Sequence, residues 1–177
     1  MKNTLKVLFV ALLAIGMFAC GEKKLTQEDL KKAEATLFNE DRTMNEEVAP
    51  EVAEKYCQFV KQHPDDSTSA KWLYHALEIN IVMKNFEKSE ELSKQLLEQY
   101  PQSDWAPMSL LVMGSYVYDH HLNDTAKAHA AFQRLIDEYP ESEWVDDAQK
   151  SIEYLGLTPD EIMTLMMLDQ MEDGGEF

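Results

Sequence analysis

The histidines are the residues whose types and spacing come closest to a chemical site. His120 and His121 lie in the segment DHHLND, close to Asp119 and Asp124. Imidazole and carboxylate groups are common metal ligands. Adjacent residues in a turn seldom point at one ion, and His129 completes no known ligand spacing. We therefore expect a solvated loop here and no metal site.

The sequence lacks the common catalytic motifs. It contains no H-E-x-x-H, no C-x-x-C, no glycine-rich phosphate loop and no G-x-S-x-G nucleophile turn. Carboxylate pairs are abundant, but a chain with 33 acids produces such pairs by chance. We expect neither an enzyme nor a cofactor, although a site built from distant residues leaves no signal in a sequence.

The first twenty residues, MKNTLKVLFVALLAIGMFAC, have the pattern of an export signal that ends at Cys20. Two lysines precede an apolar run that is too short for a spanning helix of about 20 residues. The segment resembles a bacterial lipoprotein signal, in which a small residue such as Ala19 precedes the acylated cysteine. The resemblance implies removal of residues 1–19 and attachment of a diacylglycerol and an N-acyl chain to Cys20. Ordinary secretory cleavage is the alternative.

Lipidation would place the protein in the cell envelope. Residues 20–25 would form a short tether, and Gly21 resembles the sorting signal for the outer membrane in some bacteria. We expect an outer-membrane lipoprotein of a Gram-negative-type bacterium that faces the periplasm. Cys57 then has no cysteine to pair with, and we expect a small buried helix residue rather than a nucleophile.

Charge narrows the range of partners. The formal net charge is −17, and residues 1–19 carry two lysines and no acid, so the mature chain is still more negative. Such a chain repels nucleic-acid phosphates and anionic lipid head groups. The membrane would therefore be reached through the lipid anchor alone.

Three prolines mark an internal repeat. Pro64, Pro101 and Pro140 follow similar segments, at spacings of 37 and 39 residues. Counting back from each proline, apolar residues recur at helical intervals, and the same kind of stripe follows on the next helix. A period of this length is typical of stacked helix pairs. The columns include Tyr56, Leu97, Phe132 and Ile152.

The pattern predicts an all-α superhelix of about eight helices in antiparallel pairs. We expect helices at 26–38, 46–63, 67–83, 86–100, 104–119, 124–139, 142–155 and 158–171. Sustained period-two alternation is missing, so no sheet is expected. The repeat domain then spans 26–171 and a flexible tail spans 172–177.

The stretch from Phe86 to Tyr154 resembles a tetratricopeptide-repeat lipoprotein of the bacterial envelope. The segment KAHAAFQRLIDEYPES matches the second helix of such a repeat, and Gly114 matches a small position of the first helix. The YPxSxW phrases at Tyr100 and Tyr139 resemble the long repeats of Tol-Pal-associated periplasmic proteins and of the barrel-assembly lipoprotein. The resemblance implies a protein that binds other envelope proteins.

The resemblance also implies a groove lined by the first helix of each pair. The positions that it places in the groove are Lys71, Tyr74, Glu78, Ile81, Met108, Leu111, Ser115 and Tyr118. Tyr74 and Tyr118 are the expected anchors, and packing between repeats is the alternative for both. The expected function is an adaptor for envelope integrity or assembly. A subunit of the barrel-assembly machinery and a glycan- or peptide-binding lipoprotein for uptake remain alternatives. The three tryptophans are spread at repeat-like positions, which favours packing over a glycan platform.

The last predicted helix, TPDEIMTLMMLDQM, is apolar on more than one face. Thr158 and Glu161 have the spacing of a capping box. We expect this helix to seal the end of the core. A methionine-rich surface for a partner or for self-association is the alternative.

Overall fold

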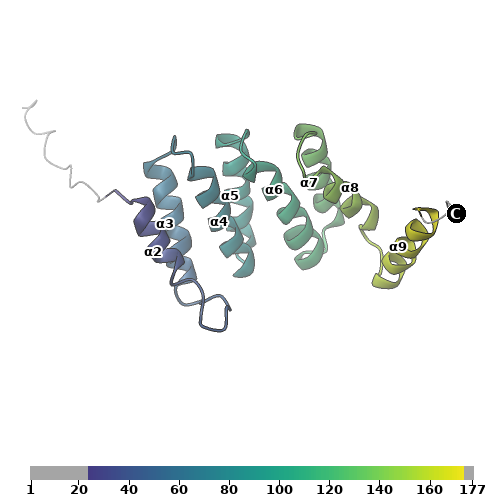
Figure 1. Cartoon of the computed structure of the whole chain (residues 1–177), viewed down its shortest axis with the longest axis horizontal. Coiled ribbons are helices and arrows are strands. Elements are labelled where there is room, and N and C mark those ends of the chain that lie inside the picture. Colours follow the sequence, from purple (N-terminus) through teal and green to yellow (C-terminus); the bar gives the residue numbers. More distant parts are fainter. Residues whose placement is uncertain (1–23, 174–177) are drawn as a thin grey trace, which may run out of the picture.

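The structure, a computed structural model, describes residues 24–173, and these form a row of helices standing side by side (Figure 1). In chain order they are α2 (Gln27–Glu34), α3 (Ala49–Gln62), α4 (Ser69–Val82), α5 (Phe86–Gln99), α6 (Trp105–Val112), its direct continuation η1 (Met113–His121), α7 (Thr125–Glu138), α8 (Val145–Tyr154) and α9 (Pro159–Asp173). The prediction of an all-α array of antiparallel helix pairs is confirmed. The β contact found among these residues is an isolated bridge between Phe38 and Met44.

The predicted signal 1–19, the lipidation site Cys20 and residues 174–177 of the predicted tail lie outside the described residues. Within residues 24–173, none of the helices is both long enough and apolar enough to cross a membrane.

The three proline turns share one backbone geometry, as the repeat predicts. The residues before the prolines, His63, Tyr100 and Tyr139, end their helices at φ of −137°, −130° and −131°. The carbonyl of each accepts a hydrogen bond from the N–H three residues later, at 2.9–3.0 Å. The proline lies inside this turn, where its missing N–H costs nothing.

The repeat-related apolar columns form the core. Tyr56, Ser93 and Phe132 occupy equivalent positions in successive repeats. Tyr56 and Phe132 are each 1% exposed. The buried side chains form two clusters, one centred on α2–α5 and one on α7 and its neighbours. Between α5 and α6 the buried hydroxyl of Ser93 donates to that of Ser109 at 3.3 Å. Each serine therefore has a partner, and among residues 24–173 no buried side-chain nitrogen or oxygen atom lacks a hydrogen bond.

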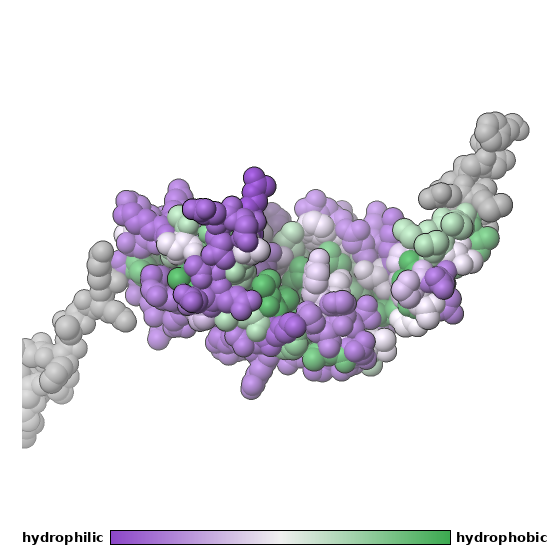
Figure 2. All heavy atoms as spheres, turned by 90° about the horizontal axis from the view of Figure 1, so that it is seen from below, coloured by the Kyte–Doolittle hydropathy of each residue, from purple (hydrophilic) through white to green (hydrophobic). Residues whose placement is uncertain are grey.

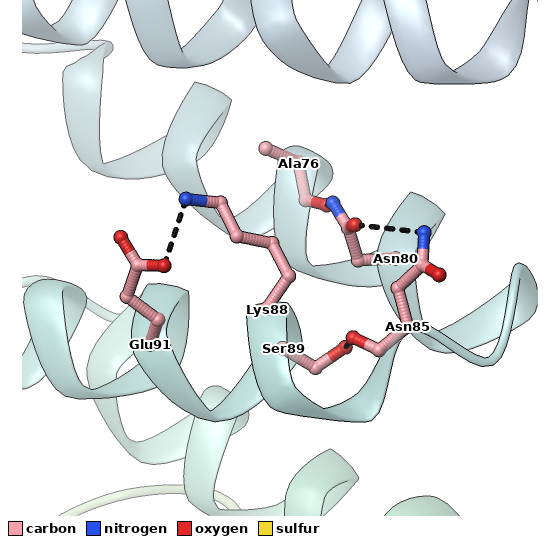
Figure 3. Close-up of polar contacts among 6 residues, drawn as sticks. All are labelled: Ala76, Asn80, Asn85, Lys88, Ser89 and Glu91. Atoms are coloured by element: carbon pink, nitrogen blue, oxygen red, sulfur yellow. Dashed lines mark hydrogen bonds and ion pairs between the residues drawn. The ribbon is translucent and has the colours of Figure 1, made fainter.

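A buried asparagine holds the turn between α4 and α5 (Figure 3). The Asn80 side chain donates to the carbonyl one turn earlier at 2.8 Å and accepts from the Asn85 amide at 3.4 Å. Lys84, in the same turn, has a left-handed φ of 60°, and Asn123 has a φ of 50° in the corresponding turn before α7. Asparagine tolerates this conformation better than lysine does.

The first helix is shorter than predicted. A capping box between Thr26 and Asp29 starts it, but α2 ends at Glu34 instead of 38. The following loop is closed by Asp41, whose carboxylate accepts hydrogen bonds from the N–H and hydroxyl of Thr43 at 3.0 and 2.6 Å. Such side-chain bonds to nearby backbone compete with the helix, and asparagine and aspartate favour turns for that reason.

Two further elements differ from the prediction. The single helix expected over 104–119 changes at Met113 from α to π geometry, in which hydrogen bonds span five residues. For example, the Leu122 N–H donates to the Val117 carbonyl at 3.0 Å. The expectation that the last helix seals the core is wrong: Met163 and Met167 are 56% and 58% exposed. The capping box between Thr158 and Glu161 at the start of α9 is confirmed.

Candidate protein-binding face

The first helices of the pairs lie on the tighter side of the array. Helices α4 and α6 pack directly against each other. On the side of the second helices, a hollow of about 780 Å³ separates α3 from α5, and one of about 420 Å³ lies among α5, η1 and α7. The direct packing of α4 on α6, with gaps between the second helices, indicates that the array curves toward the α4–α6 side in this region. We call this side the inner face.

Five aromatic rings pack on one another below the inner face. This aromatic cluster consists of Tyr56, Trp72, Tyr74, His75 and Trp105. Its ring centroids lie 4.9 Å apart for Tyr56 and Trp72, and 5.1 Å apart for Tyr74 and Trp105. Because Trp105 begins α6, these contacts fix the position of that helix against α4. Offset and edge-to-face pairs of this kind contribute about 0.5–1.5 kcal/mol each beyond the burial of their area.

Glu78 brings a charge to the edge of the aromatic cluster. One carboxylate oxygen lies 2.8 Å from Nδ1 of His75, and the side chain is 46% exposed. Burial, together with the nearby charge of Glu78, raises the pKa of the Tyr74 hydroxyl far above its usual value, so this group stays protonated at neutral pH. Glu78 is therefore held in place while still in contact with solvent.

Tyr116 is an exposed aromatic residue close to Tyr74 of the aromatic cluster. It lies in η1, is 58% exposed, and is close enough to Tyr74 to contribute to the raised pKa of that hydroxyl. The main chain can approach α7 here because Gly114 has no side chain: a Cβ at this position would lie 2.5 Å from Cε1 of Phe132. The exposed ring of Tyr116 and the carboxylate of Glu78 together form the polar and aromatic part of the inner face.

The predicted groove residues are divided between surface and core. Half-buried Lys71 lies with its Nζ 5.1 Å from the Trp72 ring centroid, and Met108 and Leu111 are half-buried on α6. Tyr74 and Ile81 are only 3% and 8% exposed. For Tyr74 the structure thus favours packing between repeats, the alternative reading, over an anchor that a partner reaches. Half-buried Ser115 lines a hollow of about 410 Å³ that α8 and α9 also border.

Tyr118 lies on the other side of the array. The Nζ of Lys127 on α7 lies 5.2 Å from its ring centroid and donates to Glu90 of α5 at 2.9 Å. Burial, and secondarily Glu90, raises the Tyr118 pKa to about 12. The prediction that it shares a groove with Tyr74 is wrong because a π-helix fits about one more residue into each turn, which rotates later side chains away from α-helical positions.

The structure also shows where the histidines of the DHHLND segment and Cys57 lie. His120 is exposed and its ring lies 4.8 Å from that of His121, which packs at 5.1 Å on Phe86. Across residues 24–173, no three histidine, cysteine or acidic side chains form a group that could hold a metal ion. Cys57 is half-buried, and burial raises the pKa of its thiol to about 11.

Sequence reasoning did not select His75 or Tyr116. His75 falls within a helix between two core positions, and only the structure shows that it meets Glu78. For Tyr116 the signal was the second repeat, which is two residues longer than the first. The structure accommodates this extra length in η1, the element that exposes Tyr116.

Comparison with known families agrees with this geometry. The tetratricopeptide repeat family matches residues 109–142, which contain part of α6, all of η1 and α7. The chain therefore contains a tetratricopeptide repeat, and repeats of this kind are generally modules for protein–protein interaction. The comparison with curated proteins gave no match.

Proposed function

We propose that this protein is an adaptor whose inner face binds a segment of another protein of the bacterial envelope. The observations that carry the proposal are the exposed ring of Tyr116 near Tyr74 and the Glu78 carboxylate held by His75, on a tetratricopeptide-type array. Tyrosine is among the residues that contribute most at interfaces, because it buries a large ring with little loss of side-chain freedom.

The partner segment is expected to carry an apolar side chain beside a basic group. The apolar group would cover Tyr116 and the half-buried Met108, and the basic group would pair with Glu78. The net charge of −17 supports a basic segment because it attracts cations over long range. Glycan capture for uptake is less well supported, because the rings of the aromatic cluster pack on one another and present no open platform.

The proposal includes a lipid anchor at Cys20 that holds the array at the outer membrane, on the periplasmic side. Its support is the signal-like segment before Cys20. Within this class, a role in envelope integrity and a role as a subunit of the barrel-assembly machinery are both consistent with the repeat. A C20A variant should leave the membrane fraction, and retention of C20A through a salt wash would contradict the anchor.

Site-specific cross-linking tests the binding face. A photoreactive amino acid replaces Tyr116 in the full chain in cells, and a matched variant carries it at Phe38, which is 55% exposed in the α2–α3 loop. We expect discrete protein adducts from position 116 that are weakened by Glu78→Gln and missing from position 38. Equal adduct patterns at both positions, or none at 116, would refute the binding face.

A further inference from the structure

Helix α9 presents an apolar surface that the repeat array leaves uncovered. Met163, Met166, Met167 and Leu168 are 56%, 50%, 58% and 51% exposed. Figure 2 shows green, hydrophobic residues gathered at the end of the molecule formed by α9. Ile162 and Leu165 are half-buried, and Ile162 borders the hollow of about 410 Å³ that η1 and α8 also line.

The three methionines form a continuous stripe. Met163, Met166 and Met167 are related by three and four residues, so they lie on one face of the helix. Methionine side chains are flexible and polarisable, and they adapt to partner surfaces of different shape. Isolated exposed apolar residues are common, whereas a contiguous stripe indicates an interaction site.

The charge around this stripe selects the partner. After Lys150 the sequence contains seven acidic residues and no lysine, arginine or histidine. The acids flank the apolar stripe on both sides in sequence, for example Asp160 and Asp169. A second copy of this chain would bring the same acids together, and an anionic lipid surface would repel them. A basic amphipathic helix complements both the apolar stripe and the acidic border.

We infer that α9 is a second docking surface, separate from the inner face, that binds a basic amphipathic helix of a partner protein through Met163, Met166 and Met167. The partner helix lays its apolar side on the methionine stripe and directs its lysines or arginines to the flanking acids. Binding here does not involve Tyr116 or Glu78, so the two surfaces can hold two different partner segments.

The test uses the full chain in detergent and three synthetic peptides. One is a helical peptide of leucine and lysine with the leucines on one face, the second has the same composition in scrambled order, and the third has glutamate in place of lysine. Affinity is measured by calorimetry for the wild type and for a Met163→Gln/Met166→Gln/Met167→Gln variant. Glutamine retains helix propensity and leaves the charge unchanged. A variant with glutamine at Val82, which is 56% exposed on α4, is the matched control.

We expect the basic amphipathic peptide to bind the wild type and the Val82→Gln control equally, and to bind the triple variant about tenfold or more weakly. The other two peptides should bind weakly to every protein. Equal binding to the triple variant would mean that the peptide binds elsewhere, for example at the inner face, or through charge alone, and it would overturn the inference. Strong binding of the acidic peptide, or a wild-type dimer that the triple substitution dissolves, would overturn it as well. The cross-linking experiment at position 116 tests the inner face separately, so its outcome does not depend on the peptide measurements.

Discussion

Gly114→Ala tests whether the repeat depends on close contact between η1 and α7. A Cβ at this position would lie 2.5, 2.8 and 2.9 Å from three ring atoms of Phe132, whereas ordinary contact begins at 3.4 Å. The ring must therefore move by nearly an ångström, and Phe132 is a buried core residue that is 1% exposed. Gly114→Ala is thus an overpacking substitution at a contact between two helices.

The expected change in the free energy of unfolding is the balance of two opposed effects. Overpacking of a core costs about 1–3 kcal/mol, while alanine is favoured over glycine within a helix by about 1 kcal/mol. Because three ring atoms are too close at once, we expect a net loss of about 1–2 kcal/mol in the free energy of unfolding. For a chain of this length that corresponds to a fall in Tm of about 2–8 °C.

Urea unfolding followed by circular dichroism measures the change. Ser115→Ala, at the adjacent half-buried position, is the control and should lie within about 0.5 kcal/mol of the wild type. Gly114→Ala combined with Phe132→Leu should lose less stability than the sum of the two single changes, because the smaller side chain makes room for the methyl group. A Gly114→Ala protein that is as stable as the wild type or more so, or strictly additive energies, would refute the close contact.

Three further outcomes are expected. Lys84→Asn should raise the free energy of unfolding by about 0.5–1 kcal/mol, because asparagine tolerates the φ of 60° there, as Asn123 does at φ 50°; unchanged urea midpoints would contradict this. Cys57 should react slowly with iodoacetamide at pH 8, and its rate should rise steeply as the pH approaches the thiol pKa of about 11; a fast reaction at pH 8 in the folded protein would refute the burial. Hydrogen bonds from Thr68 lower the pKa of Asp66 below its usual 3.8. The stability advantage of the wild type over Asp66→Asn should therefore be complete above pH 3.8 and shrink as the pH falls through the folded-state pKa. Thermal unfolding of both proteins across pH measures this difference.

The period of the sequence predicted the fold because it recorded which side chains meet in every repeat. Columns such as Tyr56 and Phe132 occupy equivalent buried positions, and the prolines mark turns of equivalent geometry. The residue types and spacing of Thr158 and Glu161 were also enough to predict their capping box. These features depend on residues close in sequence or repeated at a fixed distance, so one chain is enough to show them.

The candidate site was predicted less well because it depends on geometry that the period does not contain. A change from α to π hydrogen bonding moved Tyr118 to the side of Glu90 and left Tyr116 exposed instead. The Trp105 ring covers Tyr74, a long-range contact that no local pattern encodes. The exposure of α9 depends on how little of the array remains for it to contact, which the apolar content of its sequence does not reveal.

The C-terminal end of the row is held less firmly than its middle, and we expect this difference to set the order in which the helices open. Helix α4 contributes ten buried residues, whereas α8 contributes Ala148 alone. In a linear array each unit is stabilised chiefly by its neighbours, so amide protons should exchange with solvent first in α9, then in α8, and last in α4. A ligand that binds α9 would slow amide exchange in this helix by mass action. The C-terminal end of the protein would then be more ordered with the ligand bound than without it.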